Sequence, residues 1–371
     1  MTALGVALLL LVVYTYVGYP VLVALWAKFL PRRLSAQAGF EPSVSVCLVV
    51  HNGEPYLSDK VASLQALDYP RQSLQILIYS DGSTDGTERL ARRLAADDPR
   101  IFVVASPERL GKPTGLNRLV AEASGEVLLM TDVRQPLAPR ALRALLEPLS
   151  DPSVGCVSGS LVLAGNTGAS AYWRYEKLIR ISEARLGSMV GVSGSLYAIR
   201  REDFRGLPSD VLLDDMFVPL LTAGAHKRIV MSAEAEAYDQ AYADEREFGR
   251  KVRTLAGNYQ LLAKLPWLLV PLKNPIWFQL VSHKLLRLAC PFALLGLFWV
   301  SWVLASAPEL SPVPRSFWQV LAGAQLAFYA LAACGARAGR IGSLARTFVV
   351  LNAAAVVGLW RFLRGSQGVA W

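Results

Sequence analysis

The fold is decided by VSVCLVVHNGE, residues 44–54, where a nearly continuous apolar run ends at polar residues. A run without alternation is typical of a strand buried on both faces, as in a parallel sheet. A second such run, LQILIYSDG, covers residues 74–82, and a helical pattern over residues 55–67 separates the two. Strand, helix and strand in this order predict a parallel pair joined by a right-handed crossover.

The alternation continues along the chain and defines one domain. Further strand patterns lie at residues 101–105, 126–130 and 195–200, with helical patterns at 113–123, 168–187 and 243–264 and a helix start at 214. We therefore expect an α/β fold with an open, mostly parallel sheet in a domain of residues 40–265. Ligands of such sheets bind beyond the carboxyl ends of the strands, where Asn52, Asp81 and Asp132 stand.

Apolar segments flank this domain on both sides. Residues 1–27, 288–308 and 316–336 carry no charged side chain. Each is long enough for a membrane-spanning helix, which needs roughly 20 residues. A shorter run, 347–360, either spans with its flanking arginines reaching the interface or lies re-entrant. We predict an N-terminal transmembrane anchor over 1–30, an interfacial amphipathic segment over 266–287 and two or three transmembrane helices within 288–364.

The distribution of charge predicts the side of the membrane on which the domain lies. Lys28, Arg32 and Arg33 follow the first apolar segment, and basic residues favour the cytoplasmic side. We therefore predict an integral protein of the inner (plasma) membrane with a cytoplasmic catalytic domain. The formal charge of +9 suits membrane lipids and phosphorylated substrates as partners. Nucleic acid is not an expected partner, because no basic stripe interleaved with aromatic residues occurs.

Seven motifs follow one another in an order that resembles one enzyme family. They are VSVCLVVHNGE (44–54), ILIYSDGSTDGT (76–87), GKPTGLN (111–117), LLMTDVRQ (128–135), GVSGSLYAIRRE (191–202), LLDD (212–215) and RKVRT (250–254). Together they resemble membrane-bound glycosyltransferase family 2, inverting enzymes that include cellulose, chitin and hyaluronan synthases. The resemblance implies the nucleotide-sugar glycosyltransferase A-type fold for the cytoplasmic domain.

The same resemblance implies a reaction. It is the transfer of a sugar from a nucleotide-sugar donor, expected to be a UDP-sugar, to a saccharide or lipid-linked acceptor at the cytoplasmic membrane face. Such a hexosyltransferase-type reaction would serve polysaccharide or glycoconjugate synthesis, with other polysaccharide-assembly proteins as candidate partners. Two alternatives remain: a non-catalytic membrane scaffold that retains the sugar-nucleotide fold, and a processive polysaccharide synthase.

Several residues are expected to bind the donor. A carboxylate at a strand end can accept hydrogen bonds from a base or a ribose, and the resemblance gives this contact to Asp81. The alternative for Asp81 is a turn-forming residue before Gly82. Asn52 and Glu54 belong to the same expected donor site. Lys112 opens a helix, where an ammonium and helix N–H groups together favour a phosphate, although a solvated surface lysine is the alternative.

Asp132 is the expected metal ligand. Mg²⁺ and Mn²⁺ prefer oxygen ligands and accept one carboxylate when a diphosphate and water supply the others. The resemblance implies an Asp-x-Asp pair here, but Arg134 stands at the second position. A guanidinium cannot bind a cation, so we expect weakened metal binding, with Arg134 either gripping the donor phosphate or pairing on the surface.

Asp215 is the expected general base. Its position matches the base of the family, which takes the proton of the acceptor hydroxyl, whereas a helix cap is the alternative reading of the Asp214-Asp215 pair. In RKVRT, Arg250 and Arg253 are expected to stabilise the diphosphate leaving group, and a basic membrane-facing helix is the alternative. Thr254 occupies the position of a sugar-stacking tryptophan in processive relatives, which argues against chain extension of the cellulose type.

Overall fold

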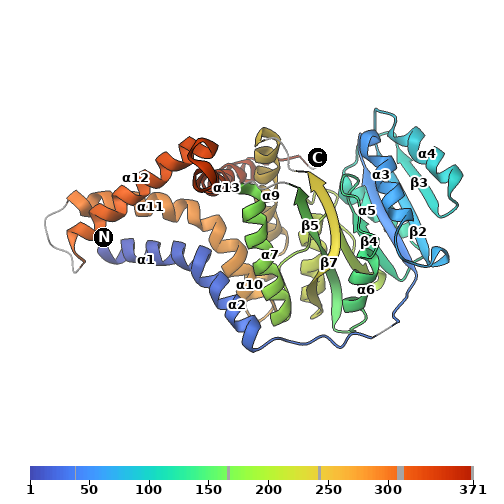
Figure 1. Cartoon of the computed structure of the whole chain (residues 1–371), viewed down its shortest axis with the longest axis horizontal. Coiled ribbons are helices and arrows are strands. Elements are labelled where there is room, and N and C mark those ends of the chain that lie inside the picture. The colour runs from blue at the N-terminus through green and yellow to red at the C-terminus, as the bar shows by residue number, and fades with distance from the viewer. Residues whose placement is uncertain (38, 165–167, 241–243, 307–312, 369–371) are drawn as a thin grey trace.

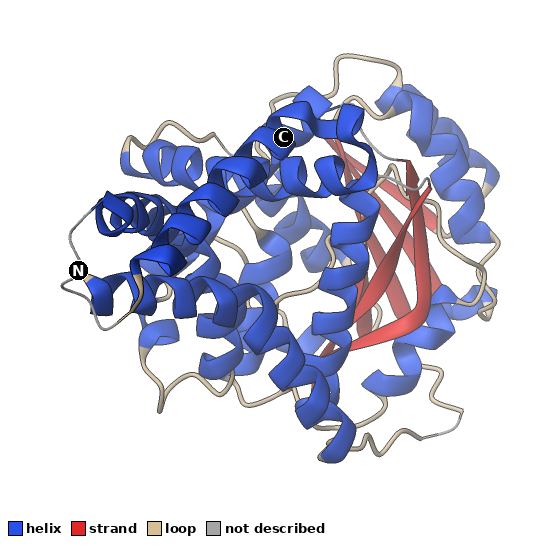
Figure 2. Cartoon of the chain, turned by 60° about the vertical axis from the view of Figure 1, so that its left-hand side comes forward, coloured by secondary structure: helices blue, strands red, loops and turns tan. Residues whose placement is uncertain are grey.

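A computed structural model describes residues 1–37, 39–164, 168–240, 244–306 and 313–368. The α/β part, with its sheet, lies beside a group of long apolar helices, and α7, Gly168–Leu186, stands between the two (Figure 1). Figure 2 shows the same division, with the sheet on one side and helices filling the other.

The described residues form a seven-stranded sheet in the order β3-β2-β1-β4-β6-β5-β7. Four strands are mutually parallel: β1 Val44–Val50, β2 Leu74–Asp81, β3 Ile101–Ser106 and β4 Val127–Thr131. β6, Leu196–Arg200, lies between β4 and β5 and runs antiparallel to both. β5, Val154–Ala164, pairs on its other side with β7, Arg228–Gln240, in parallel. The predicted α/β fold with a mostly parallel sheet is therefore confirmed.

Helices occupy the connections between the parallel strands. They are α3 Glu54–Gln65, α4 Thr87–Asp97, α5 Lys112–Glu122 and α6 Ala141–Leu149. Every residue of β1 is buried, as its continuous apolar pattern predicts. Gly111 begins α5 with φ +89, and a Cβ on Gly115 would stand 2.6 Å from the Tyr79 ring. Glycine at these positions allows α5 to approach the sheet closely.

Two strands, β5 and β7, were not expected from the sequence. β5 contains two glycines, and the later part of β7 reads SAEAEAYDQ, in which alanines alternate with acidic residues. Neither composition favours a strand. In the structure the two pair with each other, with register shifts between Val154 and Cys156 and between Ser158 and Ser160. Their strand character follows from this long-range pairing and not from local propensity.

Two further helices complete the α/β part next to the apolar helices. α8 spans Asp214–Gly224 and α9 spans Asp244–Lys264, and both begin within two residues of the predicted starts. α9 packs against α13, Gly339–Leu363, and α7 packs against α2, Tyr19–Phe29. The helix that carries the RKVRT motif, α9, is therefore in direct contact with an apolar helix.

Three helical runs among the described residues are long and apolar enough to cross a membrane: Thr2–Phe29, Trp277–Ser306 and Arg315–Leu363. The first joins α1, Thr2–Val13, to α2 through a π-helical turn, and the second joins α10, Trp277–Gln279, to α11, Leu286–Ser306, in the same way. The third contains α12, Arg315–Cys334, and α13. The predicted interfacial segment 266–287 thus ends inside a helix that continues into α11, and its border with the span stays a prediction.

A buried polar cluster ties the apolar helices to α7. The imidazole of His283 is fully buried, with Nδ1 2.9 Å from Oε1 of Glu183 and Nε2 3.1 Å from Oε2 of Glu176. Tyr19 donates a hydrogen bond of 2.6 Å to the same oxygen of Glu183, and Arg287 pairs with Glu176. Because buried charged groups are costly without partners, this cluster holds the two parts in one relative orientation.

Candidate active site

The loops after β1 and β2 are bound to each other at the carboxyl edge of the sheet. Asn52 has φ +49, and its Oδ1 accepts a hydrogen bond of 2.8 Å from the backbone N–H of Thr84. Oε2 of Glu54 accepts one of 2.8 Å from the N–H of Gly86. In this structure the two expected donor-binding side chains therefore shape the rim of the site, and contact with a donor stays a prediction for both.

Asp81 lies at the end of β2 and is fully buried. Its Oδ1 accepts a hydrogen bond of 2.7 Å from the N–H of Leu110, and its Oδ2 accepts one of 2.9 Å from the N–H of Gly111. Both carboxylate oxygens therefore hold the loop that leads into α5. The expected contact of Asp81 with the nucleoside stays a prediction, while its positioning of the start of α5 is observed.

Lys112, the first residue of α5, connects two parts of the site. Its Nζ lies 2.9 Å from Oδ1 of Asp132, after β4, and 3.0 Å from Oδ2 of Asp214, at the start of α8. Burial alone would lower the pKa of the ammonium, but Asp132, Asp214 and Asp215 outweigh it and raise the pKa of Lys112. Lys112 is therefore a fixed positive charge, and its alternative reading as a solvated surface residue does not fit its contacts.

Asp214 and Asp215 begin α8, where helix N–H groups favour negative charge. The Asp214 side chain is buried, whereas that of Asp215 keeps part of its surface accessible. Gly194 leaves room for the Asp215 carboxylate, because a Cβ on Gly194 would stand 3.2 Å from Oδ2 of Asp215. Removal from water and the charge of Asp214 raise the pKa of the Asp215 carboxyl to about 6. This value suits a group that accepts a proton near neutral pH.

The two arginines of α9 lie differently. Arg253 is half-buried and lies within electrostatic reach of Asp132, Asp214 and Asp215. Burial nevertheless lowers the pKa of its guanidinium, with the three carboxylates opposing that effect. Arg250 is more exposed and lines a separate cavity of about 330 Å³. Arg253 thus interacts electrostatically with the three carboxylates, whereas Arg250 lines the separate cavity.

Arg134 is engaged by a partner that the sequence did not indicate. Its guanidinium pairs with Oδ1 of Asp239 on β7, and Gln135 Nε2 donates a hydrogen bond of 2.8 Å to Oδ2 of the same carboxylate. The Arg134 side chain is 19% exposed and that of Asp239 is 7% exposed. Of the two alternatives for Arg134, the structure therefore contains the ion pair, in a largely buried form.

One residue of the site was missed by the sequence analysis. Lys60 of α3 is fully buried, and its Nζ donates hydrogen bonds of 2.7 Å to Thr131 Oγ1 and 2.6 Å to the carbonyl of Gln135. Burial lowers the pKa of its ammonium to about 7, and Asp132 opposes that change. Lys60 thereby fixes the segment that carries Asp132. The sequence could have indicated a buried Lys60, because this lysine lies on the same face of the helix as Leu57, Val61 and Leu64.

The residues present fit a divalent cation held by one carboxylate. Among the described parts of the chain, no group of three or more His, Cys, Asp or Glu is placed to hold an ion. Asp132 has a side chain that is 34% exposed, and Lys112 contacts only its Oδ1. A cation bound to the other oxygen would need further ligands from a diphosphate and water, which Mg²⁺ and Mn²⁺ accept.

Comparison with known proteins identifies the family. Residues 45–207 match the family model described as glycosyl transferase family 2. An N-acetylglucosaminyltransferase of Rhizobium leguminosarum bv. viciae is 29% identical over 216 residues, which cover 52% of this chain and 50% of the relative. Another, of Bradyrhizobium elkanii, is 30% identical over 124 residues, 33% of this chain and 67% of the relative. The chain thus spans about half the length of the first of these relatives.

A solved structure has the same fold over nearly the whole chain. It is the mannosyltransferase PcManGT from Pyrobaculum calidifontis, in complex with GDP-Man and Mn²⁺. The two structures superpose with a TM-score of 0.77 and 24% sequence identity, covering 99% of each chain. The expected glycosyltransferase A-type fold is thereby confirmed. This chain belongs to glycosyltransferase family 2.

Proposed function

We propose that the protein transfers a single sugar, with inversion, from a UDP-sugar to a hydroxyl of a saccharide or lipid-linked acceptor at the cytoplasmic face of the inner membrane. The observation that carries the proposal is the gathering of Asp132, Asp214 and Asp215 around Lys112 at one edge of the sheet. N-acetylglucosamine is the first donor sugar to test, because several relatives are N-acetylglucosaminyltransferases.

Asp215 is the proposed general base. The acceptor hydroxyl oxygen attacks the anomeric carbon, the bond from that carbon to the diphosphate breaks on the opposite face, and the hydroxyl proton moves to the Asp215 carboxylate. A raised pKa of about 6 leaves this carboxyl ionised at neutral pH yet basic enough to accept the proton. Asp214 is buried and ion-paired with Lys112, so it is the less suitable of the two.

The leaving diphosphate requires positive charge, and Lys112 and Arg253 supply it from α5 and α9. Lys112 contacts Asp132 and Asp214, and Arg253 interacts electrostatically with the same carboxylates. A charge held in a partly dry site stabilises a developing anion more strongly than in water. A divalent cation bound to Asp132, when present, would add charge at the diphosphate oxygens. The Arg134–Asp239 pair supports a structural role for Arg134 instead of phosphate binding.

The cavity of about 330 Å³ is the proposed approach of the acceptor. It lies between α7, α9 and the helix Trp277–Ser306, and Trp173, Arg180 and Lys284 are among its lining residues. The guanidinium of Arg180 stands 5.5 Å from the centre of the Trp173 ring and within electrostatic reach of Asp215. Aromatic and basic groups beside a candidate span suit a sugar joined to a lipid through phosphate.

A comparison of purified variants tests the proposal. Full-length protein in phosphatidylcholine nanodiscs would receive UDP-N-acetylglucosamine, UDP-glucose or GDP-mannose, Mg²⁺ or Mn²⁺, and saccharide and lipid-linked acceptors, with nucleotide diphosphate release as the readout. We expect Asp215→Asn to bind donor normally and to lose turnover by about 100- to 10,000-fold. Asp210→Asn is the matched control, since Asp210 is exposed and pairs with Lys264 at 2.7 Å. Equal turnover of the wild type and Asp215→Asn would refute the assignment of the base.

The length of the product separates single transfer from processive synthesis. Thr254 is exposed on α9, and it stands in place of the sugar-stacking tryptophan expected of a processive enzyme. The described residues contain three candidate membrane spans. Both features support transfer of one sugar. Mass spectrometry of the product should find an increment of one sugar, and a long homopolymer made by purified protein would contradict this part of the proposal.

A further inference from the structure

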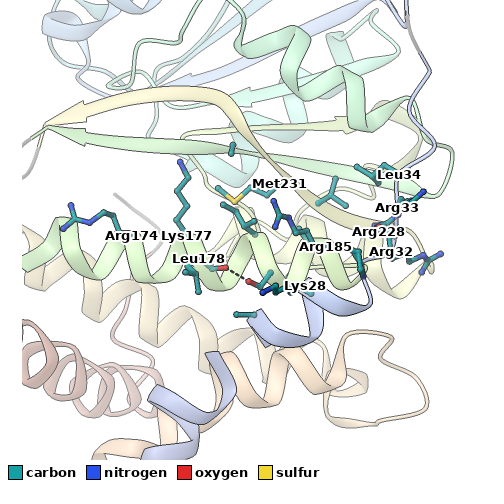
Figure 3. Close-up of a pocket in the computed structure, with 18 residues that line it drawn as sticks. Lys28, Arg32, Arg33, Leu34, Arg174, Lys177, Leu178, Arg185, Arg228 and Met231 are labelled. Carbon is teal, nitrogen blue, oxygen red and sulfur yellow. Dashed lines mark hydrogen bonds between the residues drawn. The ribbon is translucent and has the colours of Figure 1, made fainter. Parts of the chain in front are cut away.

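A large groove lies outside the candidate active site. It has a volume of about 990 Å³ and is formed by α2, the following segment 31–34, α7 and the first half of β7 (Figure 3). α2 is the last part of the candidate span Thr2–Phe29. The groove therefore opens where the chain leaves the predicted membrane on its cytoplasmic side.

Basic side chains from two parts of the chain line this groove. Lys28, Arg32 and Arg33 come from the end of α2 and the segment after it, and Arg174, Lys177 and Arg185 come from α7 (Figure 3). The three α7 residues follow one another at spacings of three and eight, so they share one helix face. All lining residues belong to the described part of the chain, and none of them is acidic.

No carboxylate of the described residues neutralises these six cations. Across the residues that the structure describes, none of the six forms an ion pair with Asp or Glu within 4.0 Å. Like charges held together repel one another, and that repulsion is relieved only by salt or by a bound anion. An uncompensated cluster on ordered elements is therefore a candidate anion site.

Hydrogen bonds fix the backbone that surrounds the groove, so its basic residues do not belong to a loose tail. Arg228 is buried, its Nε donates a hydrogen bond of 2.7 Å to the carbonyl of Gly187, and its terminal nitrogens donate to the carbonyls of Arg32 and Arg33 at 3.1 and 3.2 Å. The N–H of Arg32 donates a hydrogen bond of 2.7 Å to the carbonyl of Arg185. This buried guanidinium thus holds the segment 32–33 against α7 and sets the basic side chains around one space.

Apart from Ser182 and Arg228, the remaining lining is apolar. It includes Ala24 and Ala27 of α2, Leu178 and Ile181 of α7, and Val230 and Met231 of β7. No aromatic ring lines the groove, whose residues are all described, so it offers no stacking surface for a nucleotide base. Clustered cations above an apolar floor at the end of a candidate span match a phosphodiester joined to acyl chains.

We propose that this groove binds the headgroup of an anionic phospholipid of the cytoplasmic leaflet. Arg185 and the segment 32–33, whose backbones are hydrogen-bonded to each other, contact the phosphate, while Arg174 and Lys177 add to the attraction farther along α7. The apolar floor receives the glycerol end of the acyl chains. The lipid thereby joins the end of the first candidate span to α7 and β7 of the catalytic domain. This site is separate from the sugar-transfer site, and its occupancy does not depend on the reaction proposed above.

Native mass spectrometry of the full-length protein tests the proposal. Protein from nanodiscs of phosphatidylcholine with 20% phosphatidylglycerol would be compared with Arg174→Gln/Lys177→Gln/Arg185→Gln. We expect the wild type to retain phosphatidylglycerol in preference to phosphatidylcholine and the triple variant to retain it at least ~10-fold less, because each cation near an anionic lipid adds to the attraction. The matched control is Arg71→Gln/Arg93→Gln/Arg205→Gln, which removes the same charge from exposed sites of the α/β part.

Each outcome decides for or against the proposal. The proposal is supported if the control triple variant retains phosphatidylglycerol and the groove triple variant loses it. Arg174→Lys/Arg185→Lys, which keeps the positive charges, should retain the lipid as the wild type does. Equal loss in both triple variants would show general surface electrostatics and overturn it. Inorganic phosphate that competes fully at millimolar concentration would assign the groove to a soluble anion instead. A photoreactive phosphatidylglycerol on the unaltered protein gives a measurement that needs no variant: labelling must fall within residues 24–34 or 174–185, and labelling elsewhere contradicts the site.

Discussion

The Nζ of Lys112 lies 2.9 Å from Oδ1 of Asp132. The residue expected to bind a donor phosphate and the residue expected to bind a metal are therefore ion-paired with each other. A second carboxylate, Asp214, lies 3.0 Å from the same ammonium. Lys112 thus offsets the repulsion between two carboxylates and remains placed where a diphosphate could take over the contact.

Loss of the Lys112 charge should lower both stability and donor affinity. In Lys112→Met, Asp132 and buried Asp214 would face each other without their shared cation, and breaking a buried pair costs about 3–5 kcal/mol. We expect a lower Tm and at least ~10-fold weaker UDP-sugar binding, measured by calorimetry. Lys227→Met is the control, because Lys227 pairs with Asp203 at 2.9 Å and lies outside the site. A control that loses donor affinity equally would show that the effect comes from destabilisation alone.

The rate of transfer should depend on the ionisation of Asp215. Its pKa of about 6 means that the basic form disappears as the pH falls below that value. We expect kcat/KM to rise through about pH 6 and to reach a plateau near pH 7, in steady-state assays at low substrate concentrations. A kcat/KM that stays constant between pH 5 and pH 7 would exclude Asp215 as the general base.

The same raised pKa should make Asp215 a destabilising residue at neutral pH. A carboxyl with a higher pKa in the folded state binds more protons folded than unfolded, so stability falls as pH rises from about 4 to about 6. Asp215→Asn removes this loss and should unfold at a higher Tm than the wild type at pH 7.5, by the equivalent of about 1–3 kcal/mol. The difference should vanish near pH 4, and a variant that is less stable at pH 7.5 would contradict the assigned shift.

The strands and the edge of the sheet could be predicted from sequence because the signals are local. In β1, β2 and β4, each buried apolar run is followed directly in the sequence by polar residues. Parallel strands then bring their carboxyl ends to one edge of the sheet. The partner of Arg134 could not be found in this way. Asp239 is 105 positions away in the sequence, on a strand whose Ala-Glu alternation resembles no buried element. Lys60 was missed for a similar reason, since its hydrogen-bond partners are 71 and 75 positions distant.

Arg134→Gln distinguishes a structural arginine from a phosphate-binding one. Because Arg134 pairs with the nearly buried Asp239, its removal takes away a largely buried ion pair, and a lower Tm is expected. The donor KM should change by less than ~3-fold, whereas loss of a bidentate phosphate contact would raise it by at least ~10-fold. A double-mutant cycle in Tm that combines Arg134→Gln with Asp239→Asn should show coupling between the two residues, since each single change breaks the same ion pair. A large rise in donor KM at unchanged Tm would instead assign Arg134 to the donor and leave the ion pair as a feature of the unliganded site.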